Sequence, residues 1–461
     1  MSINLIECNR EQTYLLPPSL RDWLPENDLA WFVVDAIEGM DLKEFCAGMR
    51  GDGRGGASFP PSMMVALLVY AYCLGVRSSR QIEKLCERDI AFRVIAANQV
   101  PDHTTIARFR QEHAEKLSGL FNEVLRLCAQ AGMIKLGVVA LDGTKMKVEA
   151  ALSANRTDEG IRKEVERILK EAAEIDEAED RKYGKDKRGD ELPKELANRE
   201  SRLKRLRECR EQLKREAAAE AAKQKEKIEK RKEEEEKTGK KKRGRKPKEA
   251  DEVVSSEGKA NVSDPESRIM KTRNGYVQGY NAQVVVDEGQ LIIAADVTNE
   301  QNDKKQLIPM LDKAKESLMA VSLTEETIGA VLADAGYCSD ENLKKLPEGK
   351  TRFLINTVNE RERRQGKDAK PPRGRIPQGL TVKERMDRRL RTKAGHAIYK
   401  RRGVIVEPVF SMIKSARGVD RFNRRGLIAC VHEWKLICAT HNLLKLWREN
   451  NRKREAALAK G

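Results

Sequence analysis

The sequence predicts an α/β protein in which helices flank a mixed β-sheet, with an all-α domain at the N-terminus and a charged helical insertion. Apolar runs of strand length first occur near residue 138 and recur after residue 275. Only helical patterns precede them, and a long stretch between them has few large apolar residues. We therefore divide the chain into a helical domain at 1–132, a sheet domain at 133–156 and 261–450, an insertion at 157–260 and a basic tail at 451–461.

Length and charge narrow the class of protein. A chain of 461 residues is long enough for two or three domains, each with its own core. Its 90 basic and 73 acidic side chains give a net charge of +17, which favours a polyanionic partner, either nucleic acid or an anionic membrane surface. No apolar run is long enough to span a membrane, and the first residues lack the apolar stretch of a signal peptide.

The cysteines and histidines argue against two kinds of site. The nine cysteines are scattered and include no Cys-x-x-Cys pair, so neither a disulfide framework nor a zinc site is indicated. Only five histidines occur, which argues against a histidine-rich metal centre. A site built from carboxylates around a hard cation stays open.

The helical domain contains several short helical patterns. Residues 63–74 are apolar almost all round, which indicates a buried helix. A later short helix, residues 104–110, carries Arg108 and Arg110. Short helices followed by a basic one are typical of a helix-turn-helix module, in which these arginines would bind DNA. A plain helical bundle with solvated arginines explains the pattern equally well.

A carboxylate follows the first strand pattern. Residues 138–141 form an apolar, β-branched run typical of a strand that is at least half buried, and Asp142 comes next. A buried, unpaired carboxylate is costly, so this position needs a cation, a metal or a dense hydrogen-bond network. The alternative is that Asp142 and Gly143 end a hairpin strand, since Asp-Gly is a favourable turn pair. On this stretch alone the turn is favoured.

The amino-acid composition changes abruptly at the start of the insertion. Residues 161–250 hold 32 basic and 24 acidic side chains. This composition predicts a helical hairpin or coiled coil, broken near Tyr183 and Pro193 and without an independent compact core. Apolar residues fit one face of each helix: Ile161, Val165, Ile168 and Leu169 on the first, and Leu203, Leu206 and Leu213 on the second.

The insertion ends in a run of basic residues, 240–248. Arg243 and Arg245 flank a glycine and resemble the core of an AT-hook that binds the minor groove, although Lys246 interrupts the usual order. These residues are candidate DNA contacts. A solvated loop is the alternative, and it is favoured because a charge run without core-forming residues is usually solvated.

Regular structure resumes after the insertion. Asp334 stands at the C-terminal end of an apolar strand, whereas Asp142 is expected in the middle of one. Residues 359–395 are basic and predicted to form loops. Glu407 precedes Pro408, so we expect it at or just before the first turn of a helix. The other expected elements are an antiparallel hairpin, a helix, two strands and a closing amphipathic helix, at 275–286 and 291–298, 304–319, 327–334 and 353–356, and 427–447.

The order of these elements looks like an RNase H-like fold. In that fold the first and fourth strands lie side by side, which would bring Asp142 and Asp334 together, and a helix across the sheet would add Glu407. Three converging carboxylates repel each other unless cations lie between them, and Mg²⁺ prefers oxygen ligands. Two Mg²⁺ ions, which Mn²⁺ could replace, can activate a water or a 3′-hydroxyl and stabilise the leaving oxygen in phosphoryl transfer.

Several short motifs carry a closer resemblance. The chain resembles the DDE transposases of bacterial insertion sequences, in a branch with a helical insertion after the first Asp. The resemblance implies Asp142, Asp334 and Glu407 as a catalytic, metal-binding triad. It also implies terminal inverted repeats and target DNA as partners, a homodimer on DNA, and a cytoplasmic, nucleoid-associated protein. The motifs are Leu141–Lys145, Asn261–Met270, Gly279–Gln283, Ala333–Tyr337 and Val406–Phe410, with Gly75–Arg80 and Pro101–Thr105 in the N-terminal domain.

A basic signature surrounds the last acid. Related transposases carry Tyr, Arg, Glu and Lys there, and Tyr399, Arg402, Glu407 and Lys414 fill these positions as expected DNA contacts. The interval from Arg402 to Glu407 is one residue longer than usual, so Arg401 could take its place. Lys414 lies about two helical turns after Glu407, on nearly the same face.

The expected function is metal-dependent cleavage at the ends of an insertion sequence and transfer of the cut strand into target DNA. The alternative is an RNase H-like DNA-binding protein or nuclease that lacks strand transfer.

Overall fold

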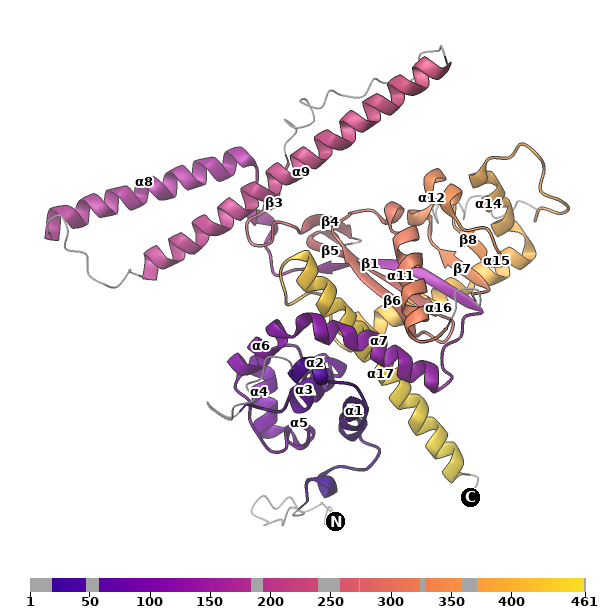
Figure 1. The fold of residues 1–461 in the computed structure, drawn as a ribbon, viewed down its shortest axis with the longest axis horizontal. Coiled ribbons are helices and arrows are strands. Elements are labelled where there is room, and N and C mark those ends of the chain that lie inside the picture. Colours follow the sequence, from indigo (N-terminus) through magenta and orange to yellow (C-terminus); the bar gives the residue numbers. More distant parts are fainter. Residues whose placement is uncertain are drawn as a thin grey trace, which may run out of the picture.

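The structure combines a central sheet, a helical domain against one end of it, and a projecting helical arm (Figure 1). It is a computed structural model. The residues that it describes are 19–46, 58–183, 194–238, 258–272, 274–323, 328–358 and 371–459.

The sheet is mixed, as the sequence predicts. β1 pairs antiparallel with β5 and parallel with β7, and its register sets Leu141 opposite Ala333. The strand order is β4-β5-β1-β7-β8, and β6 pairs with β5, so the first and fourth strands of the predicted fold are neighbours. The strands are β1 Val138–Lys147, β4 Arg268–Thr272, β5 Gly275–Asp287, β6 Ile292–Thr298, β7 Ala330–Ala333 and β8 Arg352–Ile355.

The turn expected at Asp142 and Gly143 is wrong. β1 continues through both residues to Lys147, and each pairs with a residue of β5. Strand pairing is favoured here over the Asp-Gly turn, because β5 offers pairing partners along the whole of β1. Asp142 therefore stands within a strand that is buried at its start, and its carboxylate needs a partner.

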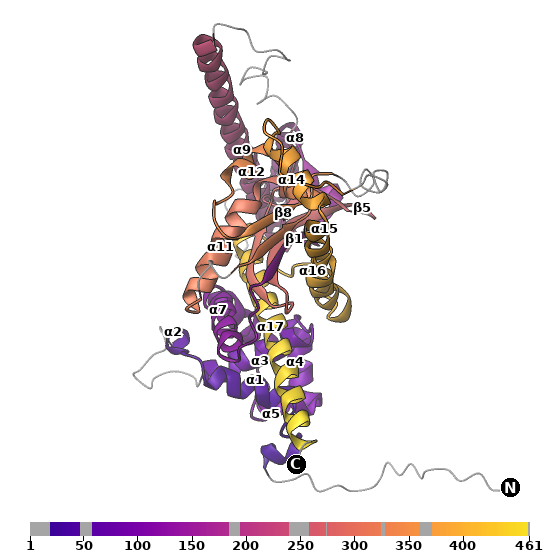
Figure 2. The same ribbon diagram turned by 90° about the vertical axis from the view of Figure 1, so that its right-hand side faces the viewer.

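Helices cover both faces of the sheet. Figure 2 shows α11 and α16 on opposite sides of the strands. The sequence predicts loops over 359–395, and this prediction is wrong for 382–395, where α14 and the start of α15 lie. Thr381 and Glu384 form a reciprocal capping box that begins α14. The helices are α11 Leu307–Ala320, α12 Asp340–Lys345, α14 Val382–Arg391, α15 Lys393–Tyr399, α16 Arg401–Ser411 and α17 Leu427–Leu458.

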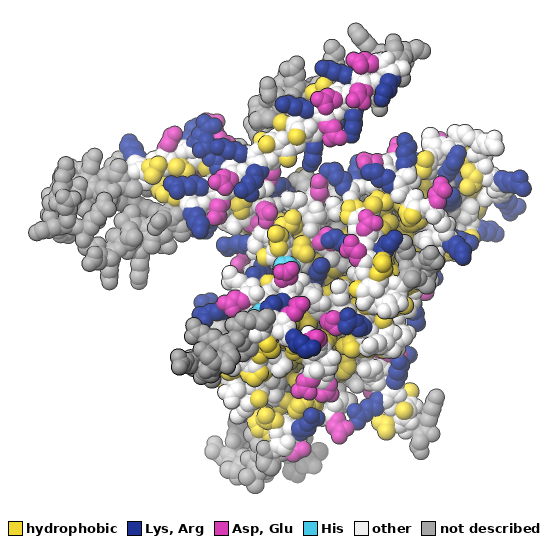
Figure 3. Space-filling view, in the orientation of Figure 1, with side chains coloured by type: hydrophobic (Ala, Val, Ile, Leu, Met, Phe, Trp, Pro, Cys, Tyr) yellow, Lys and Arg dark blue, Asp and Glu magenta, His cyan; other side chains and the backbone are white. Residues whose placement is uncertain are grey.

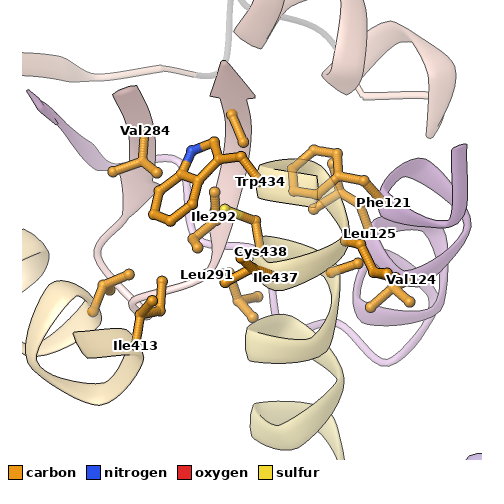
Figure 4. Packing of buried hydrophobic residues seen from close by; sticks show 14 of the residues in the cluster. Phe121, Val124, Leu125, Val284, Leu291, Ile292, Ile413, Trp434, Ile437 and Cys438 are labelled. Carbon is orange, nitrogen blue, oxygen red and sulfur yellow. The ribbon is translucent and has the colours of Figure 1, made fainter. Parts of the chain in front are cut away.

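The helical domain shares its core with the sheet. α7 and α3 pack against α17, which also packs on β6. In Figure 4, Phe121 and Leu125 face Trp434 and Ile437 of α17, with the sheet strands behind them. α17 extends 11 residues beyond the predicted end at Trp447, so most of the basic tail is helical. The helices of this domain are α1 Leu29–Glu38, α2 Lys43–Cys46, α3 Pro61–Cys73, α4 Ser79–Arg88, α5 Ile90–Ile95, α6 His103–Glu112 and α7 Ala114–Gln130.

A buried ion pair fastens the helical domain to the last part of the chain. Arg77 Nη1 lies 3.0 Å from Glu433 Oε1, and the Glu433 side chain is fully buried. The same carboxylate accepts hydrogen bonds from the backbone N–H groups of Asn423 and Arg424. Gly75 lies two residues before Arg77, and a Cβ at that position would lie 2.0 Å from the Arg417 carbonyl oxygen, so only glycine fits there. The Gly75–Arg80 motif is thus the contact between the two domains.

The insertion forms an arm with a small core of its own. α8 ends at Tyr183 and α9 begins at Lys194, as the predicted break requires. Leu169 is half exposed, so its predicted place on the packing face is wrong. Mixed Lys, Arg, Asp and Glu side chains cover the outside of both helices (Figure 3). The core contains Ile161, Ile168, Leu206, Cys209, Leu213 and Ala260, and the arm elements are β2 Asn155–Arg156, α8 Asp158–Tyr183, α9 Lys194–Thr238 and β3 Ala260–Asn261.

Candidate active site

Two carboxylates lie side by side on neighbouring parallel strands, one within β1 and one directly after β7. Asp142 and Asp334 directly follow Leu141 and Ala333, which are opposite each other in the register of β1 and β7. The backbone N–H of Gly143 donates to Asp142 Oδ1 at 2.9 Å. Asp334 begins a short 3₁₀-helix and accepts from the Gly336 N–H at 2.9 Å.

An arginine from α16 bridges the two carboxylates. Arg402 Nη2 lies 2.9 Å from Asp142 Oδ2 and 3.9 Å from Asp334 Oδ2. Its side chain is only 16% exposed, so this is a largely desolvated contact. Arg401, the other candidate for this position, pairs with Glu288 at the surface. The structure therefore brings Arg402, despite its longer interval, to the acid pair.

Burial makes ionisation of both acids harder. It raises the pKa of Asp142 to about 6, against the opposing effect of the Arg402 charge and together with the repulsion of Asp334. Burial also raises the pKa of Asp334, where Arg402 again opposes it and Asp303 adds to it. Carboxylates that resist ionisation and share one cation are typical of functional sites.

Glu407 lies on the same helix as Arg402, in its interior. α16 begins at Arg401, so the expectation that Glu407 opens a helix is wrong. Pro408 is tolerated there because Gln290 Nε2 donates at 3.0 Å to the Val404 carbonyl, which has lost its usual N–H partner. Glu407 is exposed. Its Oε1 would lie 3.3 Å from a Cβ on Gly403, so the side chain turns back along the helix.

A third aspartate, which the sequence analysis missed, belongs to this cluster. Asp303 Oδ1 accepts from Asn281 Nδ2 at 2.6 Å and from Gln283 Nε2 at 2.8 Å. It also lies 3.6 Å from Lys145 Nζ. The sequence offered no local signal for it, because Asp303 reaches Asp142 only through the pairing of β6 with β5 and of β5 with β1.

The comparison with protein families decides the identity. The profile of a transposase DDE domain matches residues 135–443, and that of a transposase domain of the DUF772 family matches residues 18–112. The chain is a DDE transposase. Comparison with curated proteins and with solved structures returned no match. Among the described residues of the transposase, no helix is long and apolar enough to cross a membrane.

The other two residues of the basic signature have partners within the transposase. Lys414 Nζ donates to the Lys145 carbonyl at 2.8 Å, from a single π-helical turn that follows α16. Tyr399 is buried at the end of α15, close enough to Arg402 for its charge to affect the pKa of the guanidinium. Both residues therefore support the site from within the fold.

The predicted DNA contacts in the rest of the transposase fall in different surroundings. Arg108 is exposed on α6. Arg110 Nη1 donates to the Arg77 carbonyl at 2.6 Å, which joins α6 to the contact between the domains. Arg243 and Arg245 lie outside the described residues.

The donor set of the site suits a hard divalent cation, and DDE transposases generally use divalent metal ions. Among the described residues, no three His, Cys, Asp or Glu side chains stand ready to hold a metal ion. Cationic side chains compensate the acids instead: Arg402 between Asp142 and Asp334, and Lys145 beside Asp303.

Proposed function

We propose that this transposase cuts DNA at the ends of an insertion sequence and joins the cut strands to target DNA. The observation that carries the proposal is the acid pair on β1 and directly after β7, with a desolvated arginine against it. Phosphoryl transfer needs little covalent chemistry from a protein, but it needs charge held in position. Two carboxylates on rigid strands supply this.

Asp142, Asp334 and Glu407 would hold the metal ions, two Mg²⁺ or Mn²⁺. When bound, the metal would activate the attacking water or 3′-hydroxyl and stabilise the leaving oxygen. Arg402 neutralises the acid pair until DNA arrives, and then turns towards a phosphate. Glu407 is five residues after Arg402 on α16, about 140° further around the helix axis, so its side chain would have to turn back along the helix to join the acid pair.

DNA is the partner in transposition, and the transposase would bind it as a homodimer over a wide area. A net charge of +17 favours strong, salt-dependent contact with phosphates. Arg108 on α6 faces solvent and is available to a terminal repeat. The basic run at 240–248 follows the exposed end of α9 and would contact phosphates or a minor groove beyond the sheet.

The test is a cleavage and joining assay on DNA that carries the terminal inverted repeats flanking the gene, with Mg²⁺ or Mn²⁺. We expect cut ends and joined products, both of which disappear when the metal is chelated. Cleavage without joining would identify a nuclease. Binding without any chemistry in either metal would identify a DNA-binding protein that keeps only the fold.

A salt titration tests the basic run. Changing Lys241, Lys242, Arg243, Arg245 and Lys246 to Gln should weaken DNA binding and flatten the dependence of log K on log salt by about 0.9 per lost phosphate contact. An unchanged slope would mean that the run is a solvated loop.

A further inference from the structure

Lys145 has a buried charge without a hydrogen-bond acceptor. It stands three residues after Asp142 in β1, and its side chain is 18% exposed. Its Nζ atom is buried and has no hydrogen-bond partner in the described structure. Burial lowers the pKa of Lys145, and the charges of Asp303, Asp334 and Asp142 act against this. A desolvated ammonium with unused donors is costly, so a ligand that supplies acceptors would bind there favourably.

Asp303 forms a long ion pair with Lys145, which leaves room for a better acceptor. The 3.6 Å separation between Asp303 Oδ1 and Lys145 Nζ is too long for a good hydrogen bond. The same oxygen already accepts from the amides of Asn281 and Gln283. Tyr337 donates its hydroxyl to Gln283 Oε1, which fixes the orientation of that amide. Asp303 therefore positions Lys145 by its charge and leaves the donors of the ammonium unused.

Two glycines allow Asp303 to reach this place. A Cβ on Gly143 would lie 2.9 Å from Asp303 Oδ1 and 2.2 Å from Gln283 Nε2. A Cβ on Gly336 would lie 3.3 Å from Asp303 Oδ2 and 3.0 Å from Asp334 Oδ1. Each glycine adjoins one of the acids of the pair, directly after Asp142 or two residues after Asp334. The Lys145–Asp303 pair is thus packed against the strand ends that carry the acids.

We propose that Lys145 contacts the scissile phosphate of the DNA and that Asp303 is its positioning residue. A nonbridging phosphate oxygen supplies the acceptor that the ammonium lacks, and its negative charge grows as the phosphoryl group is transferred. Lys145 then stabilises the transition state more than the bound substrate. This inference rests on the proposed function, and it adds a residue outside the acidic triad and its basic signature.

The test compares single-turnover cleavage rates and DNA dissociation constants for four proteins: the wild type, Lys145→Gln, Asp303→Asn and the control Lys147→Gln. Lys147 lies two residues further along β1, is 46% exposed and pairs with Asp420 at the surface. We expect Lys145→Gln to lower the cleavage rate by about a hundredfold with little change in DNA affinity, as for loss of one transition-state donor. Asp303→Asn should cause a smaller loss, and Lys147→Gln none.

A modified substrate separates contact from support of the fold. A methylphosphonate at the scissile position removes the charge that Lys145 would meet. The wild type should therefore lose more rate on this substrate than Lys145→Gln does, because the two changes remove the same interaction. A purely structural role would give the same proportional loss of rate in both proteins, and that result would overturn the proposal. The comparison holds even if Lys145→Gln is less stable, because each protein is compared with itself on the two substrates.

The outcomes also separate this proposal from the proposed function. An active wild type, an inactive Asp142→Ala and a normal Lys145→Gln would overturn the role of Lys145 alone. A wild type without cleavage on any terminal repeat would overturn the proposed function.

Discussion

The transposase buries charge in two places, and they are built differently. Between the domains, Glu433 is fully buried and accepts from Arg77 and from two backbone N–H groups. In the candidate active site three aspartates, Asp142, Asp303 and Asp334, share two cations. Buried nitrogens without a hydrogen-bond partner occur in both places among the described residues: Lys145 Nζ and Arg402 Nε at the candidate site, and Arg417 Nε at the contact between the domains. The two places therefore differ in their acids, because Glu433 has three donors whereas the acids of the candidate site outnumber its cations.

The largest effect is expected from the active-site acids. Replacing Asp142, Asp334 or Glu407 by Ala should reduce cleavage to background, because each removes a proposed metal ligand. DNA binding should stay nearly intact, since it depends mainly on Lys and Arg contacts with phosphates. Parallel cleavage and gel-shift assays measure both. If Glu407→Ala kept near-normal strand transfer, Glu407 would not be the third acid, and Asp303 would become the leading candidate.

A change at the contact between the domains should lower the stability of the protein. Glu433→Ala leaves Arg77 buried without its counter-ion, so the free energy of unfolding should fall by about 3–5 kcal/mol. Urea denaturation measures this. A joint replacement, Arg77→Met with Glu433→Leu, should regain most of the loss, because apolar side chains need no counter-ion. A double variant as unstable as Glu433→Ala would mean that the backbone contacts of Glu433, and not the ion pair, hold the domains.

A smaller effect is expected in the arm, which has only a small core. Leu206 is fully buried and Leu169 is 52% exposed. Leu206→Ala should therefore destabilise the arm by about 2–3 kcal/mol, whereas Leu169→Ala should change stability by less than about 0.5 kcal/mol. Limited proteolysis of the arm detects the difference. Equal sensitivity of the two variants would contradict the packing of α8 against α9.

The smallest effect concerns the helix that carries Glu407. Gln290→Ala removes the donor to the Val404 carbonyl, which Pro408 leaves unpaired. Because this bond is exposed to solvent, its loss should cost about 0.5–1 kcal/mol, measurable by thermal unfolding. Gln290→Glu also loses the amide donor but keeps the oxygen that accepts from Lys445 Nζ at 3.1 Å, so it should cost less than Gln290→Ala. A stability unchanged in both variants would mean that water replaces the amide.

The sequence predicted the sheet and the position of the acids well, because strand periodicity and the ends of parallel strands are local signals. Asp142 and Asp334 could be placed together from the element order. Asp303 and Lys145 could not, since they come together only through the pairing of β1, β5 and β6 and the space left by Gly143. The register between strands that are far apart in the chain cannot be read from any single stretch of the sequence.

Two of the wrong local predictions have a similar cause. Pro408 favours a helix start, but Gln290, more than a hundred residues earlier in the chain, makes it acceptable inside α16. Asp142-Gly143 favours a turn, but the full-length partner strand β5 keeps it extended. Residues 382–395 were different, because the capping box at Thr381 and Glu384 is visible in the sequence.

The helix α17 has a consequence for where DNA is cut. It spans 32 residues and packs at once against α3, α7 and β6, so the helical domain and the sheet form one continuous core. If the helical domain holds a DNA segment, as proposed, that segment lies at a fixed distance from Asp142 and Asp334. The number of base pairs between the recognised sequence and the cut would then be set by the length of a protein helix, and making the DNA between them stiffer or softer should leave that number unchanged.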